Sequence, residues 1–466
     1  MPTSCPHQGH SRRKTARPGE VGLPDAPAVE VIEGVWHVRS LPLVKEVLRS
    51  TTTTVQAGFN VDLVRDGAGN PRGGRRAMRD PILFMDGPEH RRQRSMIARY
   101  FAPATVNRRY GDLMTERADA IIAHVRRELE AGRRVELSAI ALEYSVAVAA
   151  AVIGLTESDT DGMARRLERL FGIPWQPPRS RVDGDDATGS DMAGTSDDAE
   201  ERPRGGLVGR FAALVGAAMS LRSAGAVGLF YARDVRPAIR ARRANPQEDV
   251  ISHLVEQGYS NAEITTECVT YGAAGMVTTR EYLCVVAWHL LGDADLRRRY
   301  LAGDVEERYA LLHEVLRLEP VVGHLYRRAV APLTLVDGET THIVPVGAVL
   351  DLSISSANTD PEHVGDDPLG LCPGREPGAG VRPEGMSFGD GAHRCPGNSL
   401  AIAETDTLLT RLLALPVALA EGPRLGWLDL IAGYEVSDMF LSADSGTPAA
   451  ADASDAVAPS DHHGNA

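Results

Sequence analysis

The chain has 466 residues, 43% of them hydrophobic and 24% charged, with a formal net charge of -13 at pH 7. This length and apolar content allow a large buried core, in one enzyme-sized domain or in two or three smaller ones. The acidic balance argues against general nucleic-acid binding, which needs a surplus of Lys and Arg. No apolar run has the length of a membrane span, no signal peptide opens the chain and the five cysteines lack paired spacing, so we expect a soluble cytoplasmic protein without membrane insertion.

The N-terminal region changes character along its length. Residues 1–25 hold Pro, Gly, Ser and basic residues without apolar periodicity, which predicts a disordered arm. Residues 28–50 first alternate apolar and polar side chains and then follow a helical period, which predicts a small sheet element and a helix. The polar, glycine-rich residues 51–80 are expected to form a long loop, and such loops in compact domains are often functional.

A basic helix is predicted after this loop, with Asp86 as its cap and Pro88 in its first turn. His90 and Arg94 are four residues apart and therefore share one helix face. Their donors could bind a pair of carboxylates there. A solvated basic helix end would show the same pattern, so both interpretations are open at this point.

Helical and strand periodicities account for most of the remaining chain. Helices are predicted over residues 113–130, 136–153, 159–171, 207–220, 234–244, 247–257 and about 261–291. Short strands are predicted over residues 333–336, 341–344 and 349–354. An insertion at 175–207 has almost no apolar residues and an acidic tail at 443–466 is rich in Ala, Asp, Ser and Pro, so both are predicted to be disordered.

The long helix over 261–291 carries two interior glycines, Gly272 and Gly275. Each costs about 1 kcal/mol relative to Ala in a helix interior, which suggests that another group approaches the backbone there. Thr278 follows Ala274 by four residues, so its hydroxyl could bond to that carbonyl and open a groove.

Glu314 and Arg317 lie three residues apart on one predicted helix face and can form an ion pair. An exposed pair of this kind contributes only about 0–1 kcal/mol. The pattern E-x-x-R is also common, so by itself it indicates little.

The most informative stretch is residues 388–397, F-G-D-G-A-H-R-C-P-G. Its glycines let the backbone turn sharply and approach a flat ligand closely. Pro396 suits the first turn of the helix that is predicted over 398–415. Cys395 would therefore lie at the positive end of a helix dipole, which favours a thiolate over a thiol of ordinary pKa about 8.5. Such a thiolate can be an axial haem ligand, although a lone cysteine beside a helix is more often structural.

This stretch resembles the haem-binding signature of the cytochrome P450 family, F-x-x-G-x-H-x-C-x-G, without a mismatch. The matching residues are Phe388, Gly391, His393, Cys395 and Gly397. The other motifs follow in the family's order over about residues 28–442. The resemblance implies a mainly α fold with minor β-sheets, a triangular helical prism around a buried haem, in one catalytic domain over residues 26–442. It also implies one non-covalent haem b with Cys395 as the iron ligand.

The same resemblance implies roles for the earlier motifs. His90, Arg94 and Arg327 would bind the haem propionates, with Arg328 as the alternative register for the last of these. Glu314, Arg317 and Arg375 would hold the haem-carrying loop against the core. The implied cofactor-binding residues are His90, Arg94, Ala274, Gly275, Arg327, Phe388, Gly389, His393, Cys395 and Gly397.

The oxygen side matches less completely. Thr278 corresponds to the family's alcohol that helps protonate bound dioxygen, but Val277 stands where the family usually has an acid. Glu281, one turn further on, or a water chain could substitute, although a plain glutamate paired with Arg280 explains its presence equally simply. Val322 and His324 are expected to face the substrate, with a merely packed or exposed histidine as the alternative for His324.

The resemblance implies a haem-thiolate monooxygenase that inserts one oxygen atom of O2 into a small, mostly apolar organic molecule, by hydroxylation or epoxidation. Secondary metabolism is one setting in which such a reaction is expected. Electrons would come from NAD(P)H through a reductase and a ferredoxin that docks on the basic segment carrying Arg91, Arg92 and Arg99. We expect a monomer that binds no nucleic acid. The alternatives are a peroxide-driven or oxidative-coupling enzyme, encouraged by Val277, and a haem-binding protein that does not turn over.

Overall fold

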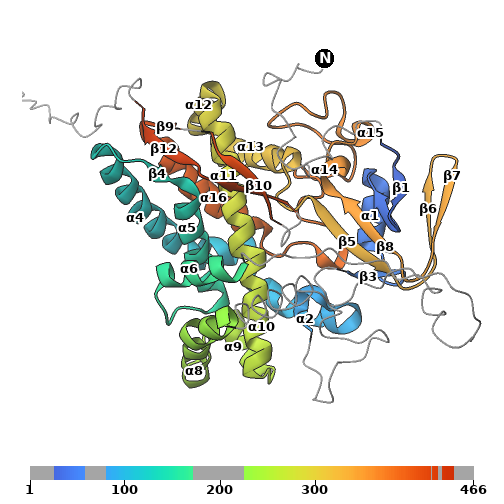
Figure 1. The fold of residues 1–466 in the computed structure, drawn as a ribbon, viewed down its shortest axis with the longest axis horizontal. Coiled ribbons are helices and arrows are strands. Elements are labelled where there is room, and N and C mark those ends of the chain that lie inside the picture. Colours follow the sequence, from blue (N-terminus) through green and yellow to red (C-terminus); the bar gives the residue numbers. More distant parts are fainter. Residues whose placement is uncertain (1–25, 58–79, 172–224, 421, 429–432, 445–466) are drawn as a thin grey trace, which may run out of the picture.

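The computed structural model describes residues 26–57, 80–171, 225–420, 422–428 and 433–444. It is mainly helical with small sheets, as predicted. Figure 1 shows the helices gathered around one long helix and the largest sheet set to one side. The arm at 1–25, the insertion at 175–207, the helix predicted at 207–220 and nearly all of the tail lie outside the described residues.

The described helices agree closely with those predicted from periodicity. The α-helices are α1 (Leu41–Arg49), α2 (Gly87–Phe101), α3 (Pro103–Thr105), α4 (Gly111–Glu130), α5 (Leu137–Ile153), α6 (Thr160–Phe171), α8 (Arg236–Ala244), α9 (Val250–Glu256), α10 (Asn261–Gly272), α11 (Thr278–Gly292), α12 (Ala294–Ala302), α13 (Val305–Leu318), α14 (Ile354–Ala357), α15 (Pro361–Val364) and α16 (Asn398–Leu413). Short 3-10 helices are η3 (Ile82–Phe84) and η7 (Gly391–His393), and π-helical turns are η4 (Val106–Tyr110), η5 (Tyr231–Val235) and η6 (Ala273–Val277).

The long helix predicted over 261–291 is confirmed as the continuous run α10–η6–α11. A capping box between Ser260 and Glu263 begins it, which satisfies backbone N–H groups that the first turn leaves without partners. α5 packs against this run and is buried on almost every side, as its uniformly apolar sequence requires. The two helices form the centre of the helical core.

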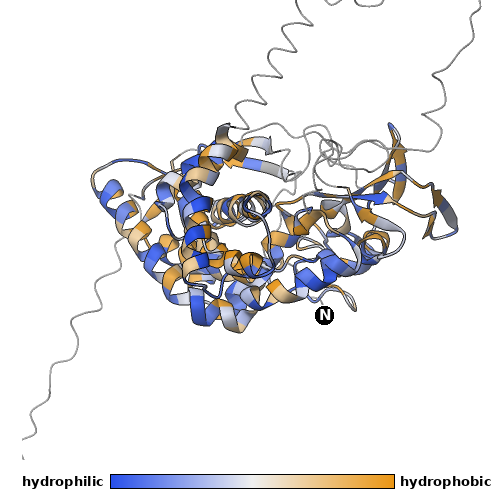
Figure 2. Cartoon of the chain, turned by 90° about the horizontal axis from the view of Figure 1, so that it is seen from below, coloured by the Kyte–Doolittle hydropathy of each residue, from blue (hydrophilic) through white to orange (hydrophobic). Residues whose placement is uncertain are grey.

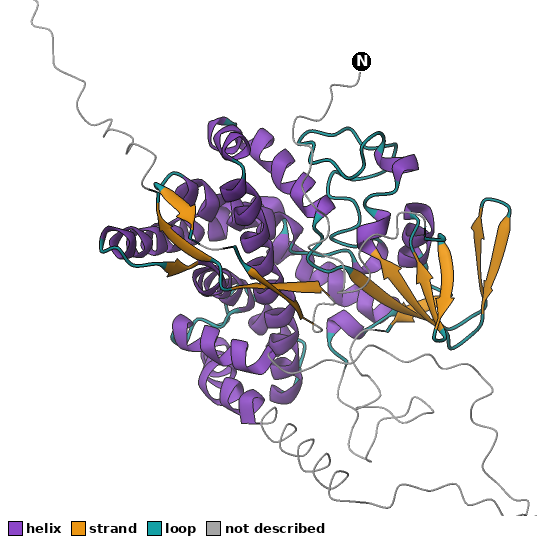
Figure 3. Cartoon of the chain, turned by 45° about the horizontal axis from the view of Figure 1, so that its top comes forward, coloured by secondary structure: helices purple, strands orange, loops and turns teal. Residues whose placement is uncertain are grey.

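The sheets are small and lie at the edges of the helical core (Figure 3). The strands are β1 (Val29–Ile32), β2 (Val35–Val38), β3 (Thr54–Gln56), β4 (Val135–Glu136), β5 (His324–Ala329), β6 (Leu333–Asp337), β7 (Thr340–Val344), β8 (Val349–Ser353), β9 (Val417–Leu419), β10 (Arg424–Leu428), β11 (Gly433–Ser437) and β12 (Phe440–Ala443). The five-stranded sheet has the order β1-β2-β8-β5-β3, with β2 and β8 parallel and the other pairs antiparallel. The strands predicted at 333–336, 341–344 and 349–354 correspond to β6, β7 and β8.

Two apolar cores result from this arrangement. The larger one joins α4, α5, α10, α11, α13 and α16, and the smaller one joins α1 to the five-stranded sheet. Figure 2 shows hydrophilic faces of the surface helices turned outward. Of the helices that the structure describes, none is both long and apolar enough to cross a membrane. The segment before α16 runs between the two cores, with Phe388 against the larger and Met386 in the smaller.

Candidate active site

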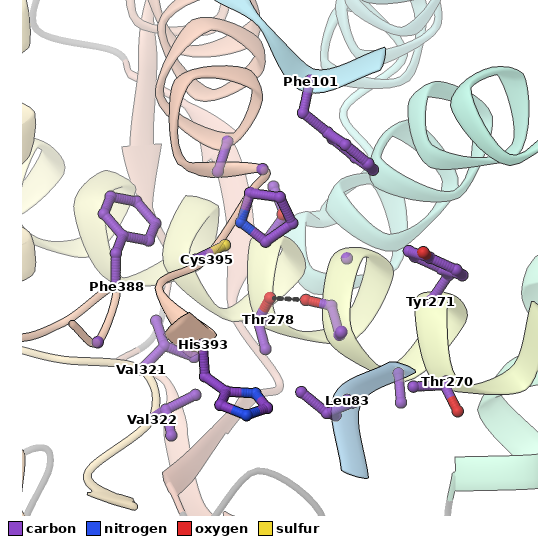
Figure 4. Close-up of a pocket in the computed structure, with 18 of the residues that line it drawn as sticks. Leu83, Phe101, Thr270, Tyr271, Thr278, Val321, Val322, Phe388, His393 and Cys395 are labelled. Carbon is purple, nitrogen blue, oxygen red and sulfur yellow. Dashed lines mark hydrogen bonds between the residues drawn. The ribbon is translucent and has the colours of Figure 1, made fainter. Parts of the chain in front are cut away.

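A cavity of about 360 Å³ lies between the α10–η6–α11 run and the loop 388–397. Cys395 and Thr278 both line it, and Figure 4 shows their side chains among the residues around it. The other predicted cofactor residues in its wall are His90, Arg94, Ala274, Gly275, Arg327, Phe388, Gly389, His393 and Gly397. The structure thus brings together residues from four distant parts of the sequence.

The cysteine loop is folded tightly enough that glycine is required in it. Gly391 has a φ of +64°, and a Cβ there would collide with the carbonyl oxygen of Leu48. The N–H of Cys395 donates to the carbonyl oxygen of Phe388 at 2.8 Å, which closes the loop on itself. Gly397 is the N-cap residue of α16, so the cysteine comes just before the helix, as predicted.

The charge state of the cysteine differs from the expectation. Burial raises the pKa of the Cys395 thiol, although the N–H of Gly397 and the guanidinium groups of Arg94 and Arg394 lower it. In the protein alone, desolvation therefore outweighs the helix end and the cations. The Gly397 N–H and the two guanidinium groups would stabilise a thiolate whose proton a bound metal ion has already displaced. The thiol environment therefore fits a metal-bound thiolate better than a free one.

The buried guanidinium of Arg327 on the cavity wall has no carboxylate partner among the described residues. Burial lowers the pKa of Arg327 to about 10. Its guanidinium donates only to the side chain of Gln56 and the carbonyl oxygen of Tyr326, at 2.7 and 2.8 Å, with no carboxylate partner among the described residues. A buried cation without a counter-ion is costly, so this site calls for an anionic ligand. Arg328 instead donates to the carbonyl oxygen of Gly347 and does not line the cavity, so Arg327 is the one of the two arginines that faces it.

His90 and Arg94 complete this anion-binding wall. The ring of His90 stacks on that of His393 with centroids 3.9 Å apart, and burial lowers the pKa of His90 to about 4. Its Nε2 atom is buried and has no hydrogen-bond partner in the described part of the chain. Arg94 donates to the carbonyl oxygen of Arg394. The nearest acid, Asp86, is bound by Nε2 of His393 at 3.2 Å. These residues fit the two carboxylates of a haem, because His90 offers the ring nitrogen that the described contacts leave free and Arg94 and Arg327 offer positive charge.

The oxygen side of the cavity contains an irregularity in the long helix. The hydroxyl of Thr278 donates to the carbonyl oxygen of Ala274 at 2.7 Å, as predicted, and Figure 4 marks this bond. The turn before it, η6, is π-helical, and Ser145 on α5 donates to the carbonyl oxygen of Met276 at 2.9 Å. A side-chain hydroxyl that donates to a helix carbonyl opens the helix locally, and a π-helical turn has the same effect. Val277 is buried and does not line the cavity.

Glu281 does not face this groove. The N–H of Val436 on β11 donates to its Oε2 atom at 2.7 Å, and Nη1 of Arg280 lies 3.0 Å from Oε1. The side chain is buried and is absent from the cavity wall, and burial raises its pKa to about 7. The expected pairing with Arg280 is present, but in the interior. These contacts tie α11 to β11 and do not support Glu281 as the proton source.

The cluster around Glu314 is a buried network. Arg317 binds Glu314 through two hydrogen bonds of 2.7 Å and donates to the carbonyl oxygens of Asn358 and Pro368. Arg375 donates to Glu314 at 3.2 Å, so the structure places it in the cluster as predicted. Asn358 accepts from the N–H of Met386, just before the cysteine loop. The network therefore connects α13 to the segment that carries Cys395.

The substrate side contains a group that sequence reasoning did not find. Val322 and His324 line the cavity, as expected. Nδ1 of His324 lies 2.8 Å from one oxygen of Asp351, and Nδ1 of His37 lies 3.2 Å from the other. Burial would raise the pKa of Asp351, but the two histidines hold it well below its usual range. The parallel pairing of β2 with β8 brings His37 opposite Asp351. No local pattern in the sequence predicts this contact.

Comparisons with known proteins agree with this geometry. Residues 309–415 match the family model described as Cytochrome P450. The chain is 27% identical over 391 residues to erythromycin C-12 hydroxylase of Saccharopolyspora erythraea, covering 82% of each protein. It is 25% identical over 427 residues to a steroid C26-monooxygenase of Rhodococcus jostii, covering 89% of this chain and 78% of that protein.

Solved structures support the same fold. A mutant of P450 EryK in complex with erythromycin B superposes with a TM-score of 0.64 at 23% identity, covering 90% of this chain and 94% of that one. CalO2 superposes with a TM-score of 0.65 at 22% identity, covering 88% and 90%. The family match, the curated relatives and the shared fold together support a cytochrome P450 monooxygenase of the haem-thiolate type. Cys395 is the residue that would bind the iron, and His90, Arg94 and Arg327 are those that would hold the propionates.

Proposed function

We propose that this monooxygenase inserts one oxygen atom into a small, mostly apolar organic molecule held between Cys395 and the α10–η6–α11 run. The observation that carries the proposal is a single cavity. Its wall contains both a sulfur that can bind iron, Cys395, and an alcohol on the oxygen side, Thr278. Bound haem supplies the redox chemistry by which dioxygen is reduced and split. The chain itself positions the substrate, excludes water and moves protons.

The cavity wall supports an apolar substrate with one polar feature. The groups around the expected substrate position are mostly apolar, among them Leu83, Val321 and Val322. His324 is a polar group in this wall, and its ring is fixed by Asp351. A mostly apolar pocket with few polar groups binds by burial of apolar surface and orients by hydrogen bonding. Relatives named as an erythromycin hydroxylase and a cyclomarin C epoxidase support a substrate from secondary metabolism.

We further propose that a ferredoxin supplies the electrons at the exposed face of α2. His90 and Arg94 face the cavity from this helix, whereas Arg91, Arg92 and Arg99 are exposed. An acidic partner would be attracted to this face, close to the propionate end of the cofactor site. Arg92→Glu should slow ferredoxin-driven reduction, and Arg126→Glu on α4 is the matched surface control. Equal reduction rates in both variants would contradict the docking site.

The reaction is tested by comparing product formation under three conditions: dioxygen with ferredoxin and reductase, hydrogen peroxide alone, and neither. A compound library is first screened for a shift in the ferric haem spectrum, which identifies a substrate. Product in the first condition supports the proposal. Product only with peroxide supports a peroxide-driven enzyme, the candidate that Val277 favours. Product in none contradicts both.

Ligation is tested separately from turnover. The reduced, carbon-monoxide-treated protein should show the red-shifted Soret band of sulfur ligation, and Cys395→Ser should lose it. An unaltered spectrum in the variant would contradict the assignment of Cys395.

A further inference from the structure

Glu267 on α10 is a buried carboxylic acid that the proposed reaction does not use. The residue is only 2% exposed, and it does not line the cavity. Its Oε1 atom accepts a hydrogen bond of 2.9 Å from the N–H of Ile82. Its Oε2 atom is buried and has no hydrogen-bond partner among the residues that the structure describes. A buried polar atom without a partner costs about 1–3 kcal/mol, so an acid kept in this position calls for an explanation.

The bond to Ile82 joins two distant segments of the chain. Ile82 lies 185 residues before Glu267 and is the first residue of η3. All three residues of η3, Ile82, Leu83 and Phe84, line the cavity. Within this turn the N–H of Phe84 donates to the carbonyl oxygen of Pro81 at 2.8 Å. A 3-10 helix of three residues makes few hydrogen bonds of its own, so its position depends on contacts with other elements.

The helix that carries Glu267 also forms part of the cavity wall, one turn further on. Thr270 and Tyr271 follow Glu267 by three and four residues, so they lie on the same face of α10. Both line the cavity, and Figure 4 shows them with Leu83 among the residues around it. The bond between Glu267 and Ile82 therefore joins η3 to the part of α10 that faces the ligand.

Loss of this acceptor would displace η3. The bond is buried, so without Glu267 the N–H of Ile82 would become a buried donor without a partner. Such a donor costs about 1–3 kcal/mol unless the segment moves towards water. Burial raises the pKa of Glu267 to about 7 and the bond from Ile82 opposes this shift, so the bond also stabilises the ionised acid. A displaced η3 would carry Leu83 and Phe84 away from their places in the wall.

We propose that Glu267 is a positioning residue that holds η3 on α10 and thereby fixes the part of the substrate cavity lined by Leu83 and Phe84. This inference rests on the proposed function, because it concerns the substrate that the cavity binds. A wall held in place before binding loses little conformational freedom when a ligand covers it. The cavity therefore selects substrates that present a rigid aromatic or alicyclic group to η3. Glu267 sets this preference without touching the substrate.

The test uses the haem-loaded protein and variants that keep or remove the acceptor. Glu267→Gln keeps a side-chain oxygen that can accept from Ile82. Glu267→Met and Glu267→Ala remove the acceptor, and the flexible methionine fills the vacated space. Thr265→Val is the control, because Thr265 is buried two residues earlier on α10 and its hydroxyl donates within that helix, to the carbonyl oxygen of Asn261. Haem content and the reduced carbon monoxide spectrum are checked first in every variant.

The first readout is hydrogen exchange at the amides of η3, followed by mass spectrometry, which does not depend on turnover. The amide of Ile82 should be protected in the parent, in Glu267→Gln and in Thr265→Val. It should exchange about tenfold faster or more in Glu267→Met and Glu267→Ala, because local opening that becomes easier by about 1.4 kcal/mol is ten times more populated.

The second readout compares two ligands that bind the ferric haem iron through an imidazole nitrogen and shift its spectrum. Imidazole is the ring alone, whereas 4-phenylimidazole adds an aromatic group that must fit into the cavity. The affinity for 4-phenylimidazole should fall about tenfold in Glu267→Met and Glu267→Ala, while the affinity for imidazole stays within about twofold. Glu267→Gln and Thr265→Val should bind both ligands as the parent does.

Unchanged exchange and unchanged affinities in both acceptor-free variants would overturn the inference. Equal losses for the two ligands, losses in Glu267→Gln as large as in Glu267→Met, or the same changes in Thr265→Val would also overturn it. Loss of haem from both acceptor-free variants would do so too, because Glu267 would then support the whole fold and not one wall. Failure of the proposed function is seen separately, as a parent protein that forms no product although its exchange and ligand affinities respond to Glu267 as expected.

Discussion

The cysteine side and the oxygen side of the cavity are built in different ways. On the cysteine side, the loop closes through the bond from Cys395 to Phe388, and the network of Glu314 and Arg317 holds the segment before it. On the oxygen side, the helix opens at a π turn, and the position before Thr278 carries an apolar side chain, Val277.

This difference shows which part of the site depends on local chain geometry and which on packing. The cysteine loop needs glycines and a helix start at fixed spacing, so its residues cannot exchange positions. The oxygen side depends instead on packing between helices, since Ser145 on α5 donates to the carbonyl oxygen of Met276 in the π turn. The predictions below test the two sides in order of decreasing effect.

The largest effect is expected from breaking the buried pair behind the cysteine loop. Arg317→Met would leave the Glu314 carboxylate buried without its main partner, which costs about 3–5 kcal/mol of folding stability. Arg298→Met is the control, because Arg298 pairs with Asp295 at the same three-residue spacing but with both side chains about three-quarters exposed. That change should cost about 0–1 kcal/mol. Urea unfolding of the haem-loaded proteins measures both, and equal losses would contradict the comparison.

A smaller loss is expected in the loop itself. Gly391→Ala would force a side chain into a left-handed conformation, at about 1–2 kcal/mol, and against the Leu48 carbonyl, at about 1–3 kcal/mol more. Gly338→Ala in the β6–β7 turn separates the two terms, since its φ is +57° but nothing lies within 4 Å of the new Cβ. Unfolding and haem retention should therefore suffer more in Gly391→Ala. A similar loss in both would show that the contact with Leu48 relaxes freely.

Sequence reasoning predicted the cysteine side well, because its signals are local. The glycines and Pro396 before an amphipathic helix indicated the placement of Cys395, and the spacing of Glu314 and Arg317 indicated their pairing. That this pair would be buried depended on the resemblance, since E-x-x-R alone does not distinguish an exposed pair from a buried one. The pKa of Cys395 was misjudged because desolvation depends on the whole surrounding core and not on the helix end.

The oxygen and substrate sides were predicted less completely, because their contacts join distant segments. Glu281 had the right spacing from Thr278, but its carboxylate accepts a hydrogen bond from the N–H of Val436 on β11. Nothing near Glu267 in the sequence indicates its bond to Ile82, which lies 185 residues away. His37 and Asp351 meet only because β2 pairs with β8.

A pH-dependent effect is expected from the buried Glu281. Its folded-state pKa of about 7 lies above the ordinary value of 4.5, so the folded protein holds an extra proton between these values. Its contribution to stability is therefore present below about pH 4.5 and is lost as the pH rises through about 7. Glu281→Gln cannot lose a proton, so the parent's advantage over it should shrink by about 1–3 kcal/mol between about pH 5 and about pH 8. Urea unfolding at both pH values gives the two differences, and a constant gap would show that Glu281 is ionised throughout.

The smallest effect, on coupling and not on folding, is expected at Thr278. Thr278→Ala removes the hydroxyl that bonds to Ala274 in the cavity wall. Protons would then reach the reacting oxygen less selectively. The fraction of NADPH electrons found in product should therefore fall about tenfold, which corresponds to about 1.4 kcal/mol. The remaining electrons should be released as hydrogen peroxide. Thr278→Ser keeps the hydroxyl and should restore most of the coupling. Peroxide released per NADPH oxidised is the measurement, with a substrate found by the spectral screen. Equal coupling in the alanine and serine variants would mean that protons reach the reacting oxygen without this alcohol.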